Sequence, residues 1–253
     1  MTKKLYIVGF GPGDYAHMTQ RAIEVMGKVD VIVGYTTYVE MVKPYFPEQT
    51  YLVTPMKQER KRCLMAIEEV LSGKDVALIS SGDSGVYGMA GIALQLVQEM
   101  ENPIEVEVIP GVTASCMAAS VLGAPLMHDF ATISLSDLMT PLELIYKRVE
   151  CCAMGDMILA LYNPRSKKRS DYIIESAKIV LQYQEESVPV GIVRHAGRKE
   201  QEVMITTLGE LIRFAEWEDD KKAMLDMFSL VIIGNSTTYV KDGKMITPRG
   251  YEL

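Results

Sequence analysis

The chain has 253 residues, 48% of them hydrophobic, and its 26 Lys and Arg against 33 Asp and Glu give a net charge of -7. This length can bury one large core or two of ordinary size. The acidic balance argues against nucleic-acid or membrane partners held by bulk charge. The first apolar run is very short and no later stretch is long enough to span a bilayer, so we expect a cytoplasmic protein.

The first half of the chain alternates apolar, β-rich runs with segments of helical period, a pattern typical of parallel sheets covered by helices. The predicted fold class is therefore α/β. Predicted strands are Lys4–Phe10, Val29–Val33, Asp75–Ser80 and Glu105–Ile109, and predicted helices lie near Thr19–Gly27, Gln58–Leu71, Tyr87–Met100 and Thr113–Leu122.

The alternation pauses near Leu122–Met127 and then resumes, which predicts an N-terminal domain over 1–122 and a second α/β domain over 123–253, both with mainly parallel sheets. Strands are expected at Phe130–Leu135, Met157–Leu161, Val188–Arg194, Glu202–Thr206 and Phe228–Ile233, and helices at Pro141–Met154, Arg169–Gln184 and Leu208–Glu216.

The loops that follow the strands are rich in Gly, Ser, Thr and Asn: GFGPGD, SSGDSGVYG and PGVTAS in the first half, LYNPRSKKR, RHAGR and GNSTTYV in the second. Ligands of parallel α/β folds bind beyond the carboxyl ends of strands, so these loops are the candidate site. GFGPGD does not fit a phosphate loop, because Asp14 stands where the dinucleotide fingerprint needs glycine and Pro12 removes an N–H donor.

Asp83 in the SGDSG loop has two interpretations that the residues alone leave open. Its carboxylate can bind a ribose hydroxyl or face a positive centre, or it can form an Asx-turn or cap the helix ahead of Tyr87. The basic clusters Lys57–Arg62 and Arg165–Arg169 are likewise solvated helix faces or carboxylate-binding patches.

Metal chemistry is not expected, because the four cysteines form no C-x-x-C pair and none lies at zinc-ligand spacing with a histidine. The residues also show no Ser-His-Asp arrangement for nucleophilic catalysis.

The motifs GFGPGD with HMT, SSGDSGVYGMAG, IPGVTASCMAAS, GAPLMHDFATISLSD, LYNPRSKKR and GNSTT together resemble the tetrapyrrole methylases of corrin synthesis, over essentially the whole chain. GYTTYVE, SLSDLMTP, LYNPRSKKR and GNSTTYV resemble the branch that methylates carbon 17 of precorrin-3B or cobalt-precorrin-3. One departure is Ser84, which stands where many family members have proline.

The resemblance implies two α/β domains, S-adenosylmethionine held in a cleft between them, a homodimer, and a tetrapyrrole substrate with or without cobalt. The implied products are S-adenosylhomocysteine and a contracted ring at the precorrin-4 level. Carried over by motif, the expected cofactor contacts are Pro12, Gly82, Asp83, Val86, Tyr87, Thr113, Ala114, Tyr162, Asn163, His195, Ala196 and Thr237.

Substrate contacts are expected from loop residues and from basic side chains that can meet the carboxylate arms of a tetrapyrrole. Asp137 and His195 are the candidate catalytic residues for the proton transfers of ring contraction, although His195 can be structural and Asp137 can cap the helix near Pro141. The predicted substrate contacts are Gly11, Asp14, Ser136, Arg165, Lys167 and Arg198.

Two other functions remain open at this point. The same fold can methylate another tetrapyrrole position or, as in a diphthine synthase, the modified histidine of a translation factor. Alternatively, the chain can be a binding protein that has kept the ligand loops and lost turnover.

Overall fold

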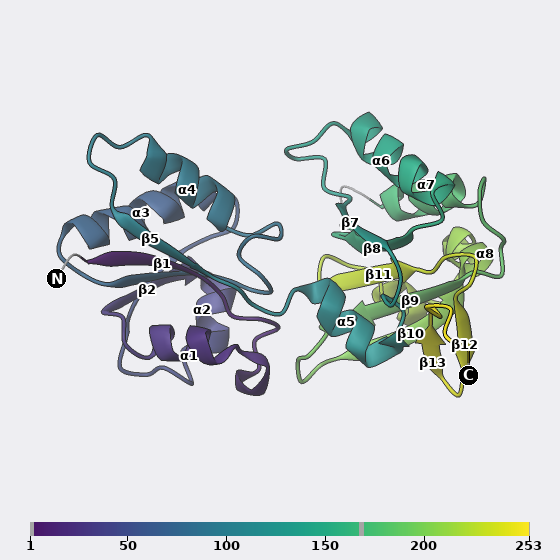
Figure 1. Cartoon of the computed structure of the whole chain (residues 1–253), viewed down its shortest axis with the longest axis horizontal. Coiled ribbons are helices and arrows are strands. Elements are labelled where there is room, and N and C mark those ends of the chain that lie inside the picture. The colour runs from purple at the N-terminus through teal and green to yellow at the C-terminus, as the bar shows by residue number, and fades with distance from the viewer. Residues whose placement is uncertain (1–2, 167–169, 253) are drawn as a thin grey trace. The chain divides into compact units, whose positions relative to one another are not determined.

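The computed structural model of the protein describes residues 3–166 and 170–252. The chain forms two compact units, Met1–Ala114 and Ser115–Leu253 (Figure 1). The division falls before the helix at 114–122, whereas the sequence places the domain boundary after it. No helix among the described residues is both long and apolar enough to cross a membrane.

The first unit is built on a five-stranded sheet of order β3-β2-β4-β1-β5, in which all pairs are parallel. Parallel pairing brings the carboxyl ends of its strands to one edge, where ligands of this fold class bind. The strands are β1 (Lys4–Gly9), β2 (Val31–Tyr35), β3 (Thr50–Thr54), β4 (Val76–Ser80) and β5 (Glu105–Ile109).

Helices cover both faces of this sheet. Side chains that alternate along the strands point to opposite faces, and on each face they pack with the helices in a separate apolar core. Leu5 and Ile7 pack in the core under α3 and α4, whereas Val8 and Ile32 pack in the core with α1 and α2. The elements are η1 (Tyr15–His17), α1 (Gln20–Met26), α2 (Thr36–Val42), α3 (Glu59–Leu71) and α4 (Ala90–Gln98).

The second unit has a five-stranded sheet of order β10-β9-β11-β8-β7. Only β7 and β8 pair in parallel, and the other three pairs are antiparallel, so this sheet is mixed rather than mainly parallel. The strands are β7 (Phe130–Ser134), β8 (Ile158–Tyr162), β9 (Pro189–Arg194), β10 (Glu202–Thr207) and β11 (Ser229–Ile233).

One face of the second sheet packs against α6, α7 and α8 in a large apolar core. The other face packs against the helix α5, which ends at Leu122. The contact is close, since a Cβ at Gly191 in β9 would collide with the Leu122 side chain. The remaining elements are α5 (Ala114–Leu122), β6 (Gly123–Ala124), α6 (Leu142–Met154), α7 (Tyr172–Val180), α8 (Leu208–Ile212), η2 (Phe214–Glu216), α9 (Asp219–Ala223), β12 (Tyr239–Lys241) and β13 (Lys244–Ile246).

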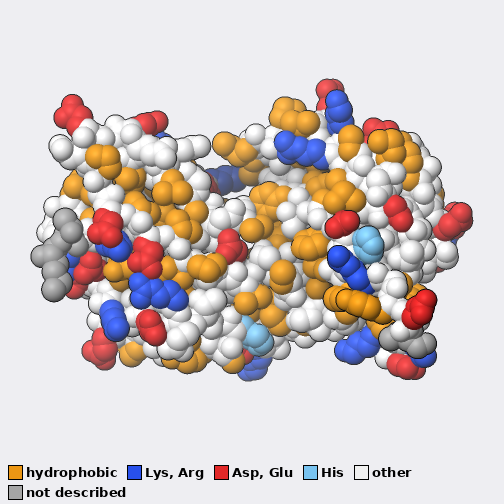
Figure 2. Space-filling view, viewed as in Figure 1, with side chains coloured by type: hydrophobic (Ala, Val, Ile, Leu, Met, Phe, Trp, Pro, Cys, Tyr) orange, Lys and Arg blue, Asp and Glu red, His pale blue; other side chains and the backbone are white. Residues whose placement is uncertain are grey.

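The α/β class and every predicted strand are confirmed to within about two residues at each end. The sequence prediction misses α2, β3, α9 and the small sheet β12-β13-β6. The surface carries charges of both signs, and Figure 2 shows them interspersed on the face in view.

Candidate functional site

Three glycine-rich loops of the first unit meet at the carboxyl edge of its sheet. Gly11 and Gly82 form an isolated antiparallel bridge, with N–H to O distances of 3.0 and 2.7 Å. The N–H of Phe10 also donates to the Ser80 carbonyl at 3.0 Å. The loops after β1 and β4 are therefore joined by backbone hydrogen bonds, as their common position at strand ends predicts.

The third loop packs against the other two so closely that only glycine fits at Gly111. A methyl group there would overlap the carbonyl oxygen of Gly82 and lie 2.5 Å from that of Gly9. A Cβ at Gly9 would in turn lie 2.7 Å from the Gly82 oxygen. These distances are below any normal van der Waals contact, so the glycines are needed for the loops to touch.

The carboxylate of Asp83 cross-links this loop cluster. Its Oδ1 accepts from the N–H of Gly85 at 2.8 Å, and its Oδ2 accepts from the N–H of Gly111 at 3.0 Å. The first bond forms the Asx-turn foreseen from the sequence. Asp83 does not cap the following helix, since α4 begins at Ala90 with Met89 as its N-cap residue.

Charge in the three loops is acidic. Over residues 9–14, 80–88 and 110–114 the ionisable side chains include Asp14 and Asp83, and there is no Lys or Arg. Asp14 caps the short helix η1 by accepting from the Ala16 N–H at 3.0 Å. A phosphate would meet two carboxylates here and no cation, whereas a positively charged ligand meets a compatible field.

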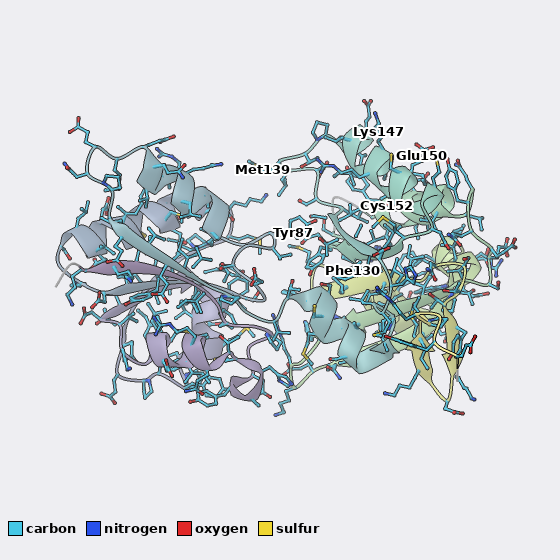
Figure 3. The ribbon with its side chains drawn as sticks, viewed as in Figure 1. Tyr87, Phe130, Met139, Lys147, Glu150 and Cys152 are labelled. Carbon is cyan, nitrogen blue, oxygen red and sulfur yellow. The ribbon has the colours of Figure 1, made fainter. Side chains whose placement is uncertain are left out.

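Tyr87 stands out in the second loop because its side chain is 55% exposed and its φ is +55°, which is uncommon for a residue with a Cβ. Figure 3 shows it beyond the carboxyl ends of the strands of the first sheet. Thr113 lies directly before α5, and Pro12 and Val86 lie in the first and second loops. The structure thus brings together the predicted contacts of the first unit.

In the second unit, the carboxyl ends of β7, β8 and β9 lie at one edge of the sheet. Tyr162 at the end of β8 accepts from the Ser115 N–H at 3.0 Å, and its hydroxyl bonds the Ser115 Oγ at the same distance. Asn163 has φ +53° and donates to Ser134 Oγ at 3.0 Å. The predicted contacts Tyr162, Asn163, His195 and Ala196 all belong to this edge.

His195 follows β9 with φ +51°, and its ring meets Phe228 edge-on at 5.1 Å between centroids. Its Nδ1 is buried without a hydrogen-bond partner in the described part of the chain. Burial lowers the pKa of His195, and the neighbouring Arg194 and Arg198 lower it further. The imidazole is therefore held neutral, with one ring nitrogen available for a ligand.

Thr237 is not brought to this edge. It follows β11, which runs antiparallel to β8 and β9, so the GNSTT loop lies at the opposite edge of the sheet. There Asn235 Oδ1 accepts from Thr237 N and Oγ1 and from Thr238 Oγ1 at 2.9–3.1 Å. Asp156 accepts from the N–H and the hydroxyl of Ser236 at 2.9 and 2.6 Å. The polar groups of the loop are thus hydrogen-bonded to one another and to Asp156, which lies before β8.

Asp137 lies in the exposed loop after β7 and accepts from the Tyr172 hydroxyl at 2.9 Å. It is not the helix cap that the sequence allows, since α6 begins at Leu142 with Pro141 as N-cap residue. Ser136 next to it donates its N–H to Ser134 Oγ at 3.3 Å. Met139, 94% exposed, extends from the same loop (Figure 3).

The predicted basic substrate contacts have different environments. Arg165 lies over the Phe214 ring at 5.0 Å, and its Nε is buried without a partner among the described residues. Arg198 lies in the loop after β9 and is partly buried. Lys167 falls outside the described residues.

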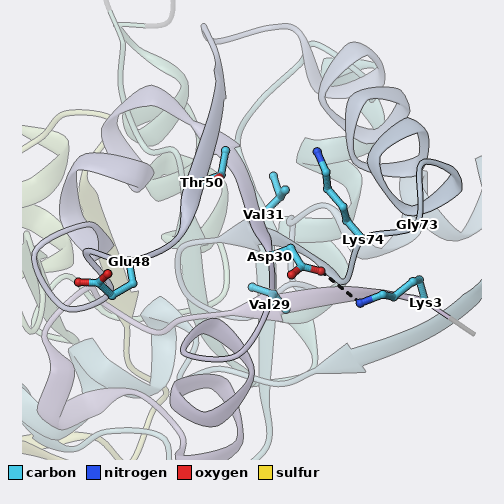
Figure 4. Close-up of a pocket in the computed structure, with 8 residues that line it drawn as sticks. All are labelled: Lys3, Val29, Asp30, Val31, Glu48, Thr50, Gly73 and Lys74. Atoms are coloured by element: carbon cyan, nitrogen blue, oxygen red, sulfur yellow. Dashed lines mark hydrogen bonds and ion pairs between the residues drawn. The ribbon is translucent and has the colours of Figure 1, made fainter. Parts of the chain in front are cut away.

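A hollow of about 450 Å³ occurs elsewhere in the first unit (Figure 4). Its lining residues precede or begin strands, so it lies at the amino edge of the sheet, away from the glycine loops. Lys3 there pairs with Asp30 at 3.3 Å and Asp75 at 3.0 Å. Within residues 3–166 and 170–252, no group of three or more His, Cys, Asp or Glu is placed to hold a metal ion.

Comparison with known proteins identifies the family. The family model for Tetrapyrrole (Corrin/Porphyrin) Methylases matches residues 4–212. The chain belongs to the tetrapyrrole methylases. A protein of Salmonella typhimurium described as a probable cobalt-factor III C(17)-methyltransferase is 47% identical over 249 residues, which cover 98% of this chain and 100% of that protein.

Two further relatives agree with this assignment to the tetrapyrrole methylases. A precorrin-3B C(17)-methyltransferase of a Sinorhizobium species is 34% identical over 259 residues, covering 99% of this chain and 98% of that protein. The crystal structure of the methyltransferase CobJ matches with a TM-score of 0.87 and 31% identity, covering 97% of this chain and 100% of that one.

Ser84, which the sequence comparison singles out as a departure from the expected proline, is well accommodated in the second loop of this tetrapyrrole methylase. The side chain is fully buried, and its Oγ lies 3.4 Å from the Ile7 carbonyl and 3.5 Å from the Ile109 carbonyl. Ser84, in the loop after β4, therefore contacts β1 within the strand and β5 at its last residue. Sequence reasoning identified the departure but not this contact, which depends on the strand order.

Proposed function

We propose that the chain is an S-adenosylmethionine-dependent C-methyltransferase of cobalamin biosynthesis. Its substrate is precorrin-3B or cobalt-precorrin-3, methylated at carbon 17 with ring contraction to the precorrin-4 level. The observation that carries the proposal is the cluster of three loops joined through Gly11, Gly82 and Gly111. The descriptions of the two relatives that match over their full length, as C(17)-methyltransferases, support the same assignment.

The residues of the loop cluster fit this cofactor. S-adenosylmethionine has a net positive charge, because its sulfonium and ammonium groups outweigh its one carboxylate, and the loops offer backbone groups and two carboxylates without a basic side chain. Pro12, Gly82, Asp83, Val86 and Tyr87 are its proposed contacts, with Asp83 acting mainly by fixing the loops. Thr113 and Ala114 on the third loop, and Tyr162, Asn163, His195 and Ala196 in the second unit, are proposed to complete the set.

When bound, the cofactor supplies an already activated methyl group and leaves as S-adenosylhomocysteine. The protein then has to hold the donor and acceptor atoms in line and exclude water. Loops fixed by backbone bonds and tight glycine contacts suit this task. No side-chain nucleophile is required of this chain.

Ring contraction needs proton transfers, for which His195 and Asp137 are the proposed residues. The ring of His195 is neutral because its pKa is lowered, and it has an unpartnered nitrogen within the described structure, so its proposed role is that of a general base. Asp137 is fixed by the Tyr172 hydroxyl. Gly11, Asp14, Ser136, Arg165 and Arg198 are the proposed substrate contacts.

The test is an assay of purified protein with labelled S-adenosylmethionine and either precorrin-3B or cobalt-precorrin-3, followed by mass and absorbance analysis. We expect the gain of one methyl group and the spectrum of a contracted ring. Methylation of another tetrapyrrole or of a translation factor, or tight cofactor binding without turnover, would refute the assignment. Light scattering and cell fractionation test the proposed homodimer and cytoplasmic location.

A further inference from the structure

The GYTTYVE segment places a row of aromatic rings at the carboxyl edge of the first sheet. Tyr35 ends β2, and its ring meets that of Tyr38 in α2 at 5.2 Å and 86°. Tyr38 in turn meets Phe10 of the first glycine loop at 5.8 Å and 75°. Both tyrosines are only half-buried. The row thus begins at the glycine loop cluster and extends along the edge toward β3.

The row ends at a buried guanidinium. Arg62 in α3 is 4% exposed, and its carbon Cζ lies 5.9 Å from the centre of the Tyr35 ring. Its Nε donates to Thr54 Oγ1 at 2.8 Å, one terminal nitrogen donates to the Pro55 carbonyl at 3.0 Å, and the other lies 3.5 Å from the sulfur of Met89. Arg62 therefore contacts the ends of β2 and β3 and the start of α4.

This buried cation has no carboxylate partner. Across residues 3–166 and 170–252, no Asp or Glu oxygen lies within 4.0 Å of the Arg62 nitrogens. Burial lowers the pKa of Arg62, while Glu59 one turn earlier raises it without contact. A guanidinium stays charged even so, and a buried charge is costly unless an opposite charge compensates it.

Its hydrogen-bonding capacity is also incompletely used. A guanidinium has five N–H groups, and the three contacts above leave two of them without an acceptor in the described structure. The side chain of Gln58, the N-cap residue of α3, likewise keeps its Oε1 buried without a partner among the described residues. The spare N–H groups of Arg62 are donors and suit a carboxylate, whereas the Gln58 oxygen is an acceptor and needs a donor.

We propose that Tyr35, Tyr38 and Arg62 form a subsite for the substrate, in which the rings contact the macrocycle and the guanidinium binds one of its carboxylate arms. The inference rests on the proposed function and extends it to three residues for which the sequence motifs predict no individual role. The macrocycle can pack against the two tyrosine rings, and one of its acidic arms can supply the negative charge that Arg62 has no partner for within the described structure.

The rest of the basic cluster supports an acidic ligand here. Lys57, Arg60 and Lys61 are exposed around the start of the same helix, whereas Arg62 points inward. Exposed lysines and arginines raise the local concentration of an anion and can be screened by salt. Arg62 alone has the burial and fixed geometry needed to bind a particular carboxylate. The two interpretations of this cluster therefore apply to different members of it.

The test compares Arg62→Met with Arg60→Met, a matched control that removes the same charge from an exposed neighbour. Tetrapyrrole binding is followed by absorbance titration with cobalt-precorrin-3 and with its methyl esters. S-adenosylhomocysteine binding is measured by calorimetry, and folding by circular dichroism. We expect Arg62→Met to weaken binding of the acid about 10- to 100-fold, and that of the esters at most about twofold. Arg60→Met should change acid binding at most about threefold, in a salt-dependent way.

Equal binding of the acid by folded Arg62→Met and wild type would overturn the inference, as would an equal loss for acid and esters. Should Arg62→Met fail to fold, Tyr38→Leu decides: it should weaken acid and esters alike by about tenfold while Tyr38→Phe binds normally. Unchanged binding by Tyr38→Leu would then refute the subsite. If wild type binds neither tetrapyrrole nor S-adenosylhomocysteine, the proposed function fails first.

Discussion

Replacing Gly111 by alanine should separate the three loops. The added methyl group would overlap the Gly82 carbonyl oxygen and lie 2.5 Å from that of Gly9. Both obstacles are backbone atoms. Gly82 is hydrogen-bonded to Gly11 through both its N–H and its carbonyl, so its oxygen cannot move away without straining these bonds. Overpacking of this kind costs about 1–3 kcal/mol, and we expect the upper half of that range.

The assay is urea unfolding followed by circular dichroism, together with calorimetric titration of S-adenosylhomocysteine. Gly91→Ala is the control, because Gly91 is exposed in α4 and an added Cβ meets nothing within 4 Å. That change should raise the free energy of unfolding by roughly 0.5–1 kcal/mol through helix propensity. Gly111→Ala should lower it and weaken ligand binding. If Gly111→Ala matches wild type in both measurements, the loops do not close as described.

Three further predictions concern the pH response, the GNSTT loop and thiol reactivity. The pKa of His195 is lowered in the folded protein, so the unfolded chain binds a proton at this residue at a higher pH than the folded chain does. The contribution of His195 to the free energy of unfolding should therefore be complete above about pH 6.5 and decrease below it. In unfolding measured as a function of pH, His195→Gln should reduce this decrease. Thr237→Val should leave S-adenosylhomocysteine affinity within about twofold by calorimetry, since Thr237 lies at the opposite edge from Tyr162, and a tenfold loss would contradict this. Burial raises the pKa of Cys63 to about 11, so iodoacetamide at pH 8 should label exposed Cys116 and spare Cys63 in peptide mass spectra.

The sequence predicts the central strands β2 and β4 well because they are nearly continuous apolar runs, buried on both faces. It misses α2 because Thr36, Thr37 and Val39 are β-branched and disfavour a helix in isolation. The helix forms because Val39 and Val42 reach the core beside β2, a tertiary contribution that local propensity does not contain. The edge strand β3 is missed because only Thr54 in it is fully buried.

Strand direction explains what the sequence misplaced in the second unit. Regular alternation of strands and helices favours a parallel sheet, and a parallel sheet would put every loop after a strand at one edge. The short segment between β9 and β10 contains no helix, and such a short connection indicates an antiparallel hairpin. That signal was available for β10. The reversed direction of β11, which moves Thr237 away, was not, because it depends on which neighbours the strand inserts between.

The paired glycines of the first two loops have a consequence for recognition. Gly11 and Gly82 fix each other during folding, so little ordering remains to be done when a small molecule arrives. Association of the ligand should accordingly be fast, and the two turns should rearrange only slightly when it binds. Evolutionary change in either turn should also require a compensating change in the other, because neither can alter its path alone.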